Sequence, residues 1–386
     1  MTTSTCPSQK PSWFRAIEEP AQEFSLTPLK VLEGQIPEAL RGSLYRNGPA
    51  RFTRGGASVN HWFDGDGAVL AVHFREGKAV ATYRYVKTRE FLEEAGAETL
   101  LYGGYGTLPA VGLRNRLQKA VKNAANTSVL VLPDRLLALW EGGRPHAISL
   151  EDLETIGIDT LGGLGDEQTF SAHPKQDWQS GEIYNFGVGL GIKGKLFVYR
   201  CDRAGKLLRQ VTHPLPGIPL IHDFALAGQY LVFCISPVRL KNPLKILVGL
   251  QSYSECLKWQ PQKGTQLLIL DRETLEIVGQ GQADPWFQWH FGNGYVNESG
   301  NVVLTLSCYP DFRSNQFLRE VVTGEIQTTA TAKLWQCELN PHTAELVASQ
   351  VLMDEVNEFP TVSPLEVGKQ AKITYFSFQH AGASKA

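Results

Sequence analysis

The sequence predicts an all-β fold made of many short strands. Three observations support this prediction: short runs of strand-forming residues recur along the chain, glycine and proline are plentiful at 37 and 21 residues, and helical periodicity is rare. Many short strands need many tight turns, which glycine and proline supply. With 42% hydrophobic and 20% charged residues, the 386-residue chain can bury a sizeable core. A β-propeller of this length forms a single unit.

The expected strands follow one another along the whole chain, and Gly, Asp or Asn turns bound most of them. Glu76–Lys78 is expected to close a hairpin between the first two. In chain order the expected strands are Ala68–Phe74, Ala79–Val86, Ser128–Leu132, Leu136–Trp140, Ile183–Val188, Lys195–Cys201, Tyr230–Ile235, Gln266–Leu270, Val302–Leu306, Leu334–Leu339 and Ile373–Phe378.

A weak internal repeat groups some of these strands into hairpins. Each copy has the order strand, polar turn, strand, and the Asp or Asn of the turn bonds its own backbone. The copies recur roughly every 50 to 70 residues, which favours propeller blades with insertions. The repeat alone leaves a sandwich or a barrel open. Its copies are Ser149–Ile156, Cys201–Leu207, Leu270–Val278 and Leu339–Val347.

Two segments depart from the strand pattern and are expected to be helical. Gly112–Ala124 places apolar residues on one face between basic ones. Asn242–Lys258 begins with Asn242 as a helix cap and Pro243 at the first helical position, and it carries a tight cluster of leucine, isoleucine and valine. Two interpretations stay open: the helices cap the domain, or they form an apolar surface that rests in a lipid headgroup layer.

Composition excludes several classes of protein. The net charge of -2 offers no basic surplus for nucleic acid. The six cysteines form no CxxC pair, and the polar segment Met1–Pro11 is no secretory leader, so we expect a reducing, cytoplasmic compartment. No stretch approaches the length of an apolar transmembrane helix. If the protein meets a membrane, it is expected to lie on its surface.

Three of the nine histidines lie among apolar or aromatic residues. A buried imidazole needs a partner for each ring nitrogen, and a metal is one such partner. The spacings between these histidines are too long for a local metal motif, so the residues alone leave open a core role for each. The three are His173 in Thr169–Lys175, His222 in Pro219–Phe224 and His290 in Trp286–Gly294.

The order of several motifs resembles the carotenoid cleavage oxygenase family, which includes apocarotenoid oxygenases, plant carotenoid cleavage dioxygenases and the retinoid isomerase of the eye. The resemblance runs from about residue 25 to about residue 377. The matching segments are Arg41–Pro49, His61–Gly67, Ser171–Lys175 followed by Glu182–Gly187, Ile221–Phe224, His290–Gly294 and Glu358–Pro360.

The resemblance implies a seven-bladed β-propeller with short helices capping one face and Fe(II) on its axis. Histidines from different blades hold the iron in that family, and by resemblance His173, His222 and His290 are the first three ligands. Glu141 and Glu358 match two of the family's glutamates that orient the ligand rings. The implied activity is cleavage of a double bond of a carotenoid or apocarotenoid by O₂ to give two carbonyl compounds.

The sequence departs from the family near its end. It contains no Gly-Phe-His-Gly-like motif, so the family's fourth histidine is not matched, and neither is the third orienting glutamate. His380 stands near the end without a matching motif around it. We therefore expect one propeller domain over residues 1–386, with about five to six blades and without the closing blade. The strand Ile373–Phe378 is expected to lack a hairpin partner.

Three classes of function follow from these observations. The first is an iron-dependent oxygenase, which the motifs match best. The second is an inactive truncated homologue or an apocarotenoid-binding protein without catalysis, because the site is one ligand short. The third is a metal-dependent hydrolase on a similar propeller, although the calcium sites of such enzymes use carboxylate and amide oxygens rather than histidines.

Overall fold

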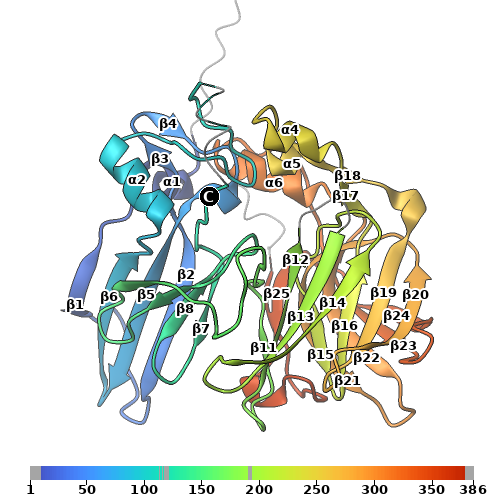
Figure 1. Cartoon of the computed structure of the whole chain (residues 1–386). Helices are drawn as coiled ribbons and strands as arrows, with labels where there is room; N and C mark the ends of the chain where they lie inside the picture. The colour runs from blue at the N-terminus through green and yellow to red at the C-terminus, as the bar shows by residue number, and fades with distance from the viewer. Residues whose placement is uncertain (1–9, 113, 115, 117–120, 190–193, 379–386) are drawn as a thin grey trace, which may run out of the picture.

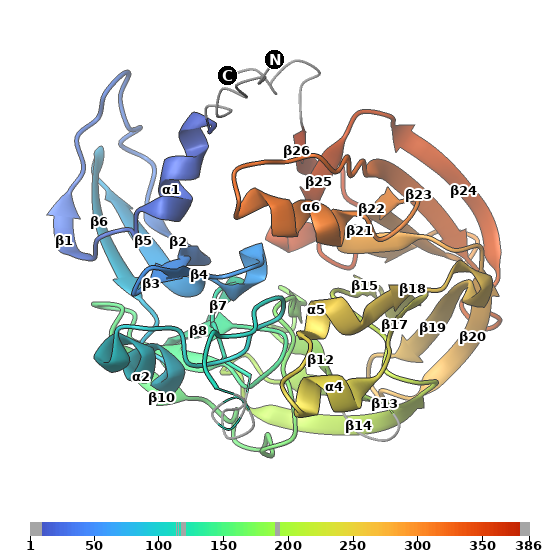
Figure 2. The same cartoon turned by 90° about the horizontal axis from the view of Figure 1, so that it is seen from above.

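The computed structural model describes residues 10–112, 114, 116, 121–189 and 194–378. Five four-stranded antiparallel sheets dominate this part of the chain. They follow one another in chain order around a common axis, as Figures 1 and 2 show. Helices α2, α4, α5 and α6 lie at one end of the sheets (Figure 1). The arrangement is all-β and propeller-like.

Each of the five sheets is built from strands that are close together in the chain. In spatial order, the first sheet contains β1 (Phe24–Pro28), β6 (Lys78–Tyr85), β5 (Asp66–Arg75) and β2 (Gly42–Arg51). The second contains β10 (Thr155–Ile158), β9 (His146–Ile148), β8 (Leu136–Leu139) and β7 (Ser128–Val131). The third contains β11 (Lys175–Gln176), β12 (Ile183–Gly189), β13 (Gly194–Cys201) and β14 (Leu207–Leu215). The fourth contains β15 (Ala225–Ala227), β16 (Tyr230–Ile235), β19 (Thr265–Asp271) and β20 (Ile277–Ala283). The fifth contains β21 (Phe287–Val296), β22 (Val302–Tyr309), β23 (Lys333–Leu339) and β24 (Leu346–Met353).

Smaller elements complete the described part of the molecule. The two-stranded sheets pair β3 (Thr53–Arg54) with β4 (Ala57–Ser58), β17 (Val238–Leu240) with β18 (Leu257–Trp259), and β25 (Asn357–Thr361) with β26 (Tyr375–Phe378). The α-helices are α1 (Arg15–Glu18), α2 (Arg89–Ala97), α4 (Pro243–Leu247), α5 (Tyr253–Cys256) and α6 (Ser314–Val321). The 3-10 turns are η1 (Ser12–Phe14), η2 (Trp62–Asp64), η3 (Pro261–Lys263) and η4 (Pro364–Glu366).

The turns of the internal repeat are built alike, with the Asp202 turn one residue shorter than the others, and they join the third and fourth strands of sheets two to five. Each begins with a side-chain oxygen, from Ser149, Asp202, Asp271 or Asn340, that accepts backbone N–H groups two to four residues further along. Each ends on a residue with positive φ, which closes the turn and starts the return strand. These residues are Leu153 at 61°, Gly205 at 81°, Leu275 at 60° and Ala344 at 53°.

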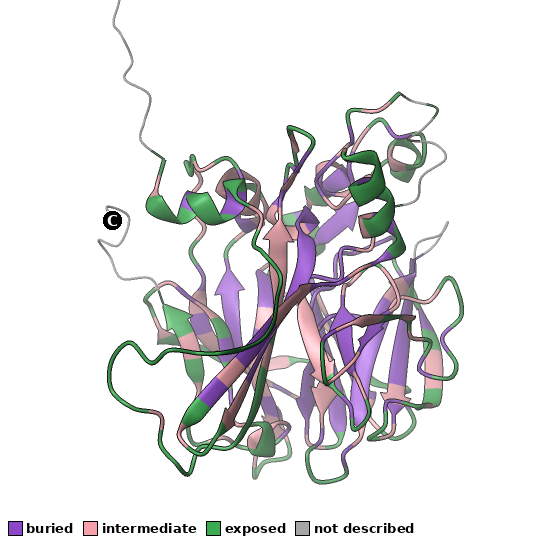
Figure 3. Cartoon of the chain, turned by 90° about the vertical axis from the view of Figure 1, so that its left-hand side faces the viewer, coloured by how far each residue is buried: buried purple, intermediate pink, exposed green. Residues whose placement is uncertain are grey.

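The core lies between neighbouring sheets. One apolar cluster joins the third and fourth sheets through Phe186, Phe224 and Phe233, and another joins the fourth and fifth through Val232, Ile269 and Leu304. Every residue of β16 is buried, whereas the outer strand β24 is mostly exposed. Figure 3 shows that buried segments are concentrated in the strands and exposed ones in the loops. The sheets therefore hold together mainly by face-to-face packing of side chains.

The structure corrects two expectations about secondary structure. Asn242–Lys258 is not one helix: it forms the short helices α4 and α5 and then enters β18. Gly249, at a φ of 65°, separates the two helices, because a left-handed residue cannot continue an α-helix. The expected strand Ile373–Phe378 contains β26, and it has a partner, since β26 pairs antiparallel with β25.

Some expectations lie wholly or partly outside the described residues. The expected helix Gly112–Ala124 includes Leu113, Asn115 and residues 117–120, which the structure does not describe. His380 also lies outside the described residues. No helix in the described ranges is long and apolar enough to cross a membrane.

Candidate metal centre

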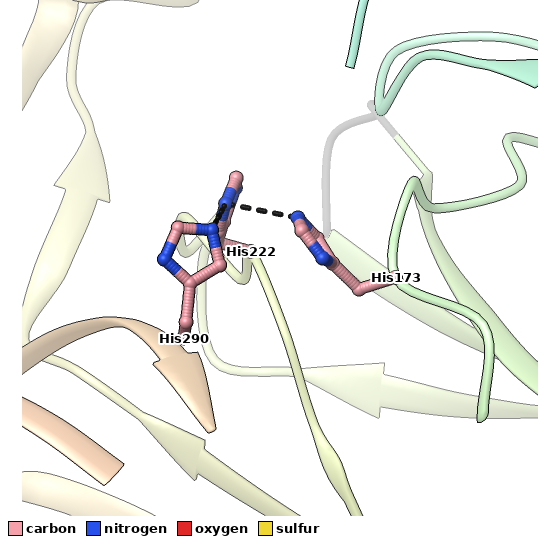
Figure 4. Close-up of side chains that lie close together, drawn as sticks. All are labelled: His173, His222 and His290. Carbon is pink, nitrogen blue, oxygen red and sulfur yellow. Dashed lines mark hydrogen bonds between the residues drawn. The ribbon is translucent and has the colours of Figure 1, made fainter. Parts of the chain in front are cut away.

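The structure brings His173, His222 and His290 together from three consecutive sheets. His173 stands just before β11, His222 just before β15, and His290 within β21, so each belongs to the first strand of its sheet or to the segment leading into it. His222 Nε2 lies 3.0 Å from His173 Nε2 and 3.3 Å from His290 Nε2. Figure 4 shows the rings turning these nitrogens toward one another. One ligand atom from each residue fits within 4.8 Å of the others.

Two glutamates contact the opposite side of these rings. Glu358 Oε2 lies 2.8 Å from His290 Nδ1, and the carboxylate of Glu141 contacts His222 Nδ1. Tyr309 donates its hydroxyl to the other oxygen of Glu358 at 2.7 Å, which holds this carboxylate in place. Both sequence-predicted glutamates therefore stand beside the histidines, one following β8 and one in β25.

These contacts decide which ring nitrogens carry protons. An imidazole that donates Nδ1–H to a carboxylate presents a lone pair on Nε2 when the ring is neutral. His222 and His290 then turn two lone pairs toward each other across 3.3 Å, with a third nitrogen from His173 beside them. A proton on His222 Nε2 relieves one of the two contacts at most. A single cation between the three nitrogens relieves all of them.

Burial and the glutamates set the charge of the site. Burial lowers the pKa of His173 well below its usual value, and the nearby rings of His222 and His290 lower it further. Burial also opposes the charged form of His222, but the carboxylate of Glu141 outweighs it and raises the pKa of that ring. For Glu358, burial alone would raise the pKa, yet the contact with His290 leaves it lowered. The carboxylate of Glu141 thus stabilises the positive character of the His222 ring.

The arrangement fits a transition-metal ion. Imidazole nitrogens suit iron, zinc or copper, whereas calcium prefers oxygen. Two nitrogens bound at right angles to one ion, each about 2.1 Å from it, lie about 3.0 Å apart, which is close to the distances that separate these rings. Carboxylates on the outer nitrogens of the ligand rings are a common feature of such sites. The residues present therefore fit a bound metal.

Aromatic side chains cover the side of His222 that faces the helices. The Phe63 ring lies parallel to the His222 ring at 6.3 Å, and Trp289 meets it edge-on at 4.8 Å. Tyr105 packs against both Phe63 and Tyr253 of α5. These residues belong to an apolar cluster that extends to α4 and α6. His222 thus meets a largely apolar surface on this side.

A cavity of about 410 Å³ lies beside His173 and His290. His173 and His290 line it, together with Lys175, Asp223 and Phe359. Phe359 packs over the His290 ring with centroids 4.6 Å apart. The site therefore combines apolar cover near His222 with a cavity of mixed apolar and polar lining beside the other two rings.

The remaining described histidines take no part in this cluster. His61 is fully buried, accepts from the Phe63 N–H at 3.1 Å, and has a pKa lowered by burial to about 3. His73 pairs with the Ser43 hydroxyl at 2.7 Å, and His213 lies 2.8 Å from the carbonyl of Leu275. His342 is exposed in a turn. The contacts of His61, His73 and His213 are structural, whereas His342 faces solvent.

Sequence reasoning missed several side chains around the site. Tyr105 and Tyr253 come from segments far from the histidines in sequence, and no local pattern marks them as neighbours. Phe63 lies in the matched segment His61–Gly67, but nothing in that segment indicates contact with His222. Lys175 and Asp223 had a signal, since each lies within two residues of a histidine in a matched motif. Their ion pair, with Lys175 Nζ 2.8 Å from Asp223 Oδ1, appears only once the sheets are packed together.

Fold and site together define a propeller-like protein with a histidine cluster at the meeting point of its sheets. Comparison with known proteins agrees. The family model described as retinal pigment epithelial membrane protein matches residues 17–386. The chain belongs to this family, that of the carotenoid-cleaving oxygenases, as its motifs predicted.

The curated relatives include enzymes that are named for different substrates. The apocarotenoid-15,15'-oxygenase of Synechocystis sp. is 34% identical over 99% of this chain and 80% of its own length. Carotenoid cleavage oxygenase 1 of Neurospora crassa is 26% identical over 92% of this chain. Isoeugenol monooxygenase of Pseudomonas putida is 32% identical over 71% of this chain. The alignments span 66% and 56% of those last two relatives, respectively.

Solved structures show the same fold. The crystal structure of cobalt-substituted Synechocystis ACO superposes with a TM-score of 0.85 at 34% identity, covering 95% of this chain and 78% of that one. A crystal structure of an ACO/RPE65 chimera gives the same TM-score and coverage. The all-β, propeller-type fold expected from the sequence is therefore confirmed.

Proposed function

We propose that this protein is a non-haem Fe(II) oxygenase that cleaves a double bond of a carotenoid or apocarotenoid. One O₂ molecule and one carbon–carbon double bond give two carbonyl groups, so both oxygen atoms enter the products and no further reductant is needed. The homologues named for cleavage of carotenoids and apocarotenoids support this substrate class. A seven-bladed propeller is the architecture that the family implies for the whole protein.

The proposed site assigns a role to each residue of the cluster. His173, His222 and His290 would hold the iron, and a bound Fe(II) with open coordination positions would supply the activation of O₂. Glu141 and Glu358 keep the protons on the outer ring nitrogens, so the inner ones stay available as ligands. The two carboxylates also supply negative charge near a cation that neutral imidazoles would leave uncompensated.

The aromatic cover beside His222 suits a conjugated, apolar substrate. Phe63 and Trp289 pack directly against the His222 ring, and Tyr105 and Tyr253 extend the surface toward the helices. A polyene placed there would lose its contact with water next to the metal ligands, which favours binding and excludes competing reactions.

One observation carries this proposal above the others: three imidazoles, that of His222 buried and the other two partly buried, turn their inner nitrogens toward one point while carboxylates contact the outer nitrogens of two of them. The test pairs two assays on the purified chain. Elemental analysis measures iron per chain, and chromatography measures the aldehyde formed from an apocarotenal in air. We expect His222→Ala to lose both, whereas His342→Ala, in an exposed turn, keeps both.

The alternative classes predict different outcomes of the same assays. Stoichiometric iron with no aldehyde would favour the apocarotenoid-binding protein without catalysis, as would substrate binding without any metal. Calcium in place of iron would favour the hydrolase. The nitrogen donor set argues against calcium, since that ion takes oxygen ligands.

We also propose that α4 and the residues after it contact a membrane surface. Leu244 and Leu247 are each 74% exposed and Leu250 is 60% exposed, beside exposed Lys241 and Lys245. Apolar side chains flanked by lysines suit an anionic lipid surface. The second expected membrane segment, 112–124, lies largely outside the described residues.

Flotation with anionic liposomes tests the membrane proposal. Leu247→Glu should reduce the floated fraction, because a charge replaces the exposed apolar side chain. Leu208→Glu is the matched control, since this leucine is 53% exposed on β14 and away from α4. Equal flotation of Leu247→Glu and the unaltered protein would contradict the proposal.

A further inference from the structure

The segments that carry the three histidines belong to separate sheets. The distances between these segments must therefore be fixed by contacts that cross from one sheet to another. No strand pairing joins the third, fourth and fifth sheets among the described residues. Their relative position depends on packing and on polar side chains that cross between them. A cluster of ligands that must converge to within a few tenths of an ångström requires rigid support.

Asp223 makes such a connection. It follows His222 directly, and its side chain is 1% exposed. Its Oδ1 lies 2.8 Å from Nζ of Lys175, the residue two positions after His173. Its Oδ2 accepts the backbone N–H of Phe291 at 2.8 Å, the residue after His290. One buried carboxylate therefore contacts all three histidine-bearing segments.

The local backbone shows why these contacts exist. β21 shifts register against β22 on both sides of Phe291, which marks an irregular strand at the point where His290 stands. The Phe291 N–H is taken up by Asp223 at this irregularity. On the other side, Lys175 is held in β11, where it pairs with Tyr184, and its ammonium lies 5.8 Å from the centre of the Phe224 ring.

We propose that Lys175 and Asp223 are positioning residues for the metal ligands. The ion pair fixes the distance between the His173 and His222 segments, and the Asp223 contact with Phe291 fixes His290 relative to both. This inference rests on the proposed function, because it assumes that the histidines bind a metal. It adds two residues to the two glutamates that support the ligand rings.

The chain offers a matched control. Arg272 Nη1 pairs with Asp177 Oδ2 at 3.0 Å and also joins the third and fourth sheets, two residues beyond Lys175. The side chains of this control pair are 24% and 10% exposed, comparable to the 19% of Lys175. It does not contact a residue adjacent to a histidine of the cluster. Loss of either pair should cost stability, but only loss of Lys175–Asp223 should disturb the ligands.

Cobalt(II) is the probe, because its visible absorption spectrum reports the geometry of the coordinated ligands. The Co²⁺ dissociation constant is measured by competition with a chelator, together with the spectrum and the melting temperature. We expect Lys175→Met and Asp223→Asn each to weaken Co²⁺ binding by about 10-fold or more and to change the bands. The isosteric Asp223→Asn keeps the shape of the side chain and should fold. Lys175→Arg should restore the affinity, and Arg272→Met should lower only the melting temperature.

The outcomes separate the inference from the proposed function. If the unaltered protein binds Co²⁺ through His222 but Lys175→Met and Asp223→Asn match Arg272→Met in affinity and spectrum, the positioning role is wrong and the proposed site stands. If the unaltered protein does not bind Co²⁺, or His222→Ala binds it equally well, the metal site itself is wrong and the inference falls with it. A non-additive effect in the double variant supports the inference, because it shows that the two residues act as a unit.

Discussion

At the scale of single residues, Glu358 contacts three groups of the site, which is more than its sequence motif indicates. Its Oε2 faces His290 Nδ1 and also accepts from the backbone N–H of Phe359, while its Oε1 accepts from the Tyr309 hydroxyl. The Tyr309 pKa is raised, first by burial and then by this carboxylate. The tyrosine therefore stays protonated and keeps donating to Glu358.

Glu358→Gln should weaken metal binding by about 10- to 100-fold, the usual cost of losing an outer partner of a ligand histidine. The amide keeps the size of the side chain but cannot hold the proton on His290 as a carboxylate does. Competition with a chelator measures the Fe²⁺ affinity. Glu355→Gln, exposed in the same segment, is the control. Equal affinities for the two variants would show that Glu358 does not support the ligand.

Much of the site could be predicted at this scale, and the reason is chemical. His173, His222 and His290 lie in apolar surroundings where a free imidazole is costly, and their motifs match a family in order. The contributions of Phe63 and Tyr253 to the aromatic cover could not be predicted, because these residues reach the site only through the packing of separate sheets and α5. Asp223 was visible as a neighbour of His222, but its contacts with the other two segments depend on tertiary structure.

At the scale of elements, close contacts between strands and loops constrain single glycines. A Cβ on Gly187, in β12, would lie 2.0 Å from the Thr169 carbonyl oxygen, in the segment that leads to His173. The Thr169 backbone cannot move away from an added methyl group without a cost in stability. Gly187→Ala should therefore destabilise the fold by about 1–3 kcal/mol and displace the His173 segment.

Thermal unfolding and metal affinity measure this effect together. Gly48→Ala in β2 is the control, since a Cβ there meets nothing within 4 Å. We expect a lower melting temperature and weaker Fe²⁺ binding for Gly187→Ala, and neither for Gly48→Ala. Unchanged melting of Gly187→Ala would mean that the strand accommodates the methyl group by moving.

The loop after α6 gives a pH-dependent prediction at the same scale. Glu320 accepts from the N–H groups of Gln327 and Thr328 and from the Thr328 hydroxyl. Burial alone would raise its pKa, but these hydrogen bonds lower it from 4.5 to about 2. A carboxylate whose pKa is lower in the folded than in the unfolded state stabilises the fold at pH values above its unfolded pKa. This stabilisation is lost as the pH falls through the folded pKa.

Hydrogen exchange protection of Gln327 and Thr328 should therefore be constant above about pH 5 and fall between roughly pH 4.5 and pH 2. Glu320→Gln should show weaker protection throughout and no such step. Protection that falls equally in both proteins would assign the step to another group.

The strands themselves were largely predictable because each alternates or concentrates apolar residues between clear turn residues. The expected runs Tyr230–Ile235 and Leu334–Leu339 match β16 and β23 within a residue. The division of Asn242–Lys258 into two short helices and a strand could not be predicted from its apolar cluster, because that cluster does not reveal the positive φ of Gly249. The cluster also left open whether the segment is buried, and Leu244 and Leu247 are exposed. Apolar content does not distinguish a buried helix from an exposed one.

At the scale of the whole molecule, a bound metal should stabilise the fold by linking three sheets. At a free metal concentration about 100 times the dissociation constant, binding adds about 2.7 kcal/mol. For a chain of this length that corresponds to a rise of roughly 3 °C in melting temperature. Calorimetry with and without Fe²⁺ measures it under anaerobic conditions. The shift should vanish in His290→Ala, and a shift that persists there would place the metal elsewhere.

The proposed chemistry depends above all on one metal ion lying between His173, His222 and His290. Anomalous diffraction at the iron absorption edge from crystals of the Fe²⁺-loaded chain locates iron by a signal that is specific for this element. We predict a single strong peak about 2.0–2.2 Å from the Nε2 atoms of all three histidines, and no peak there in His222→Ala crystals. A peak bound to other residues, or none at this point in fully loaded crystals, would show that the three histidines are not the iron site.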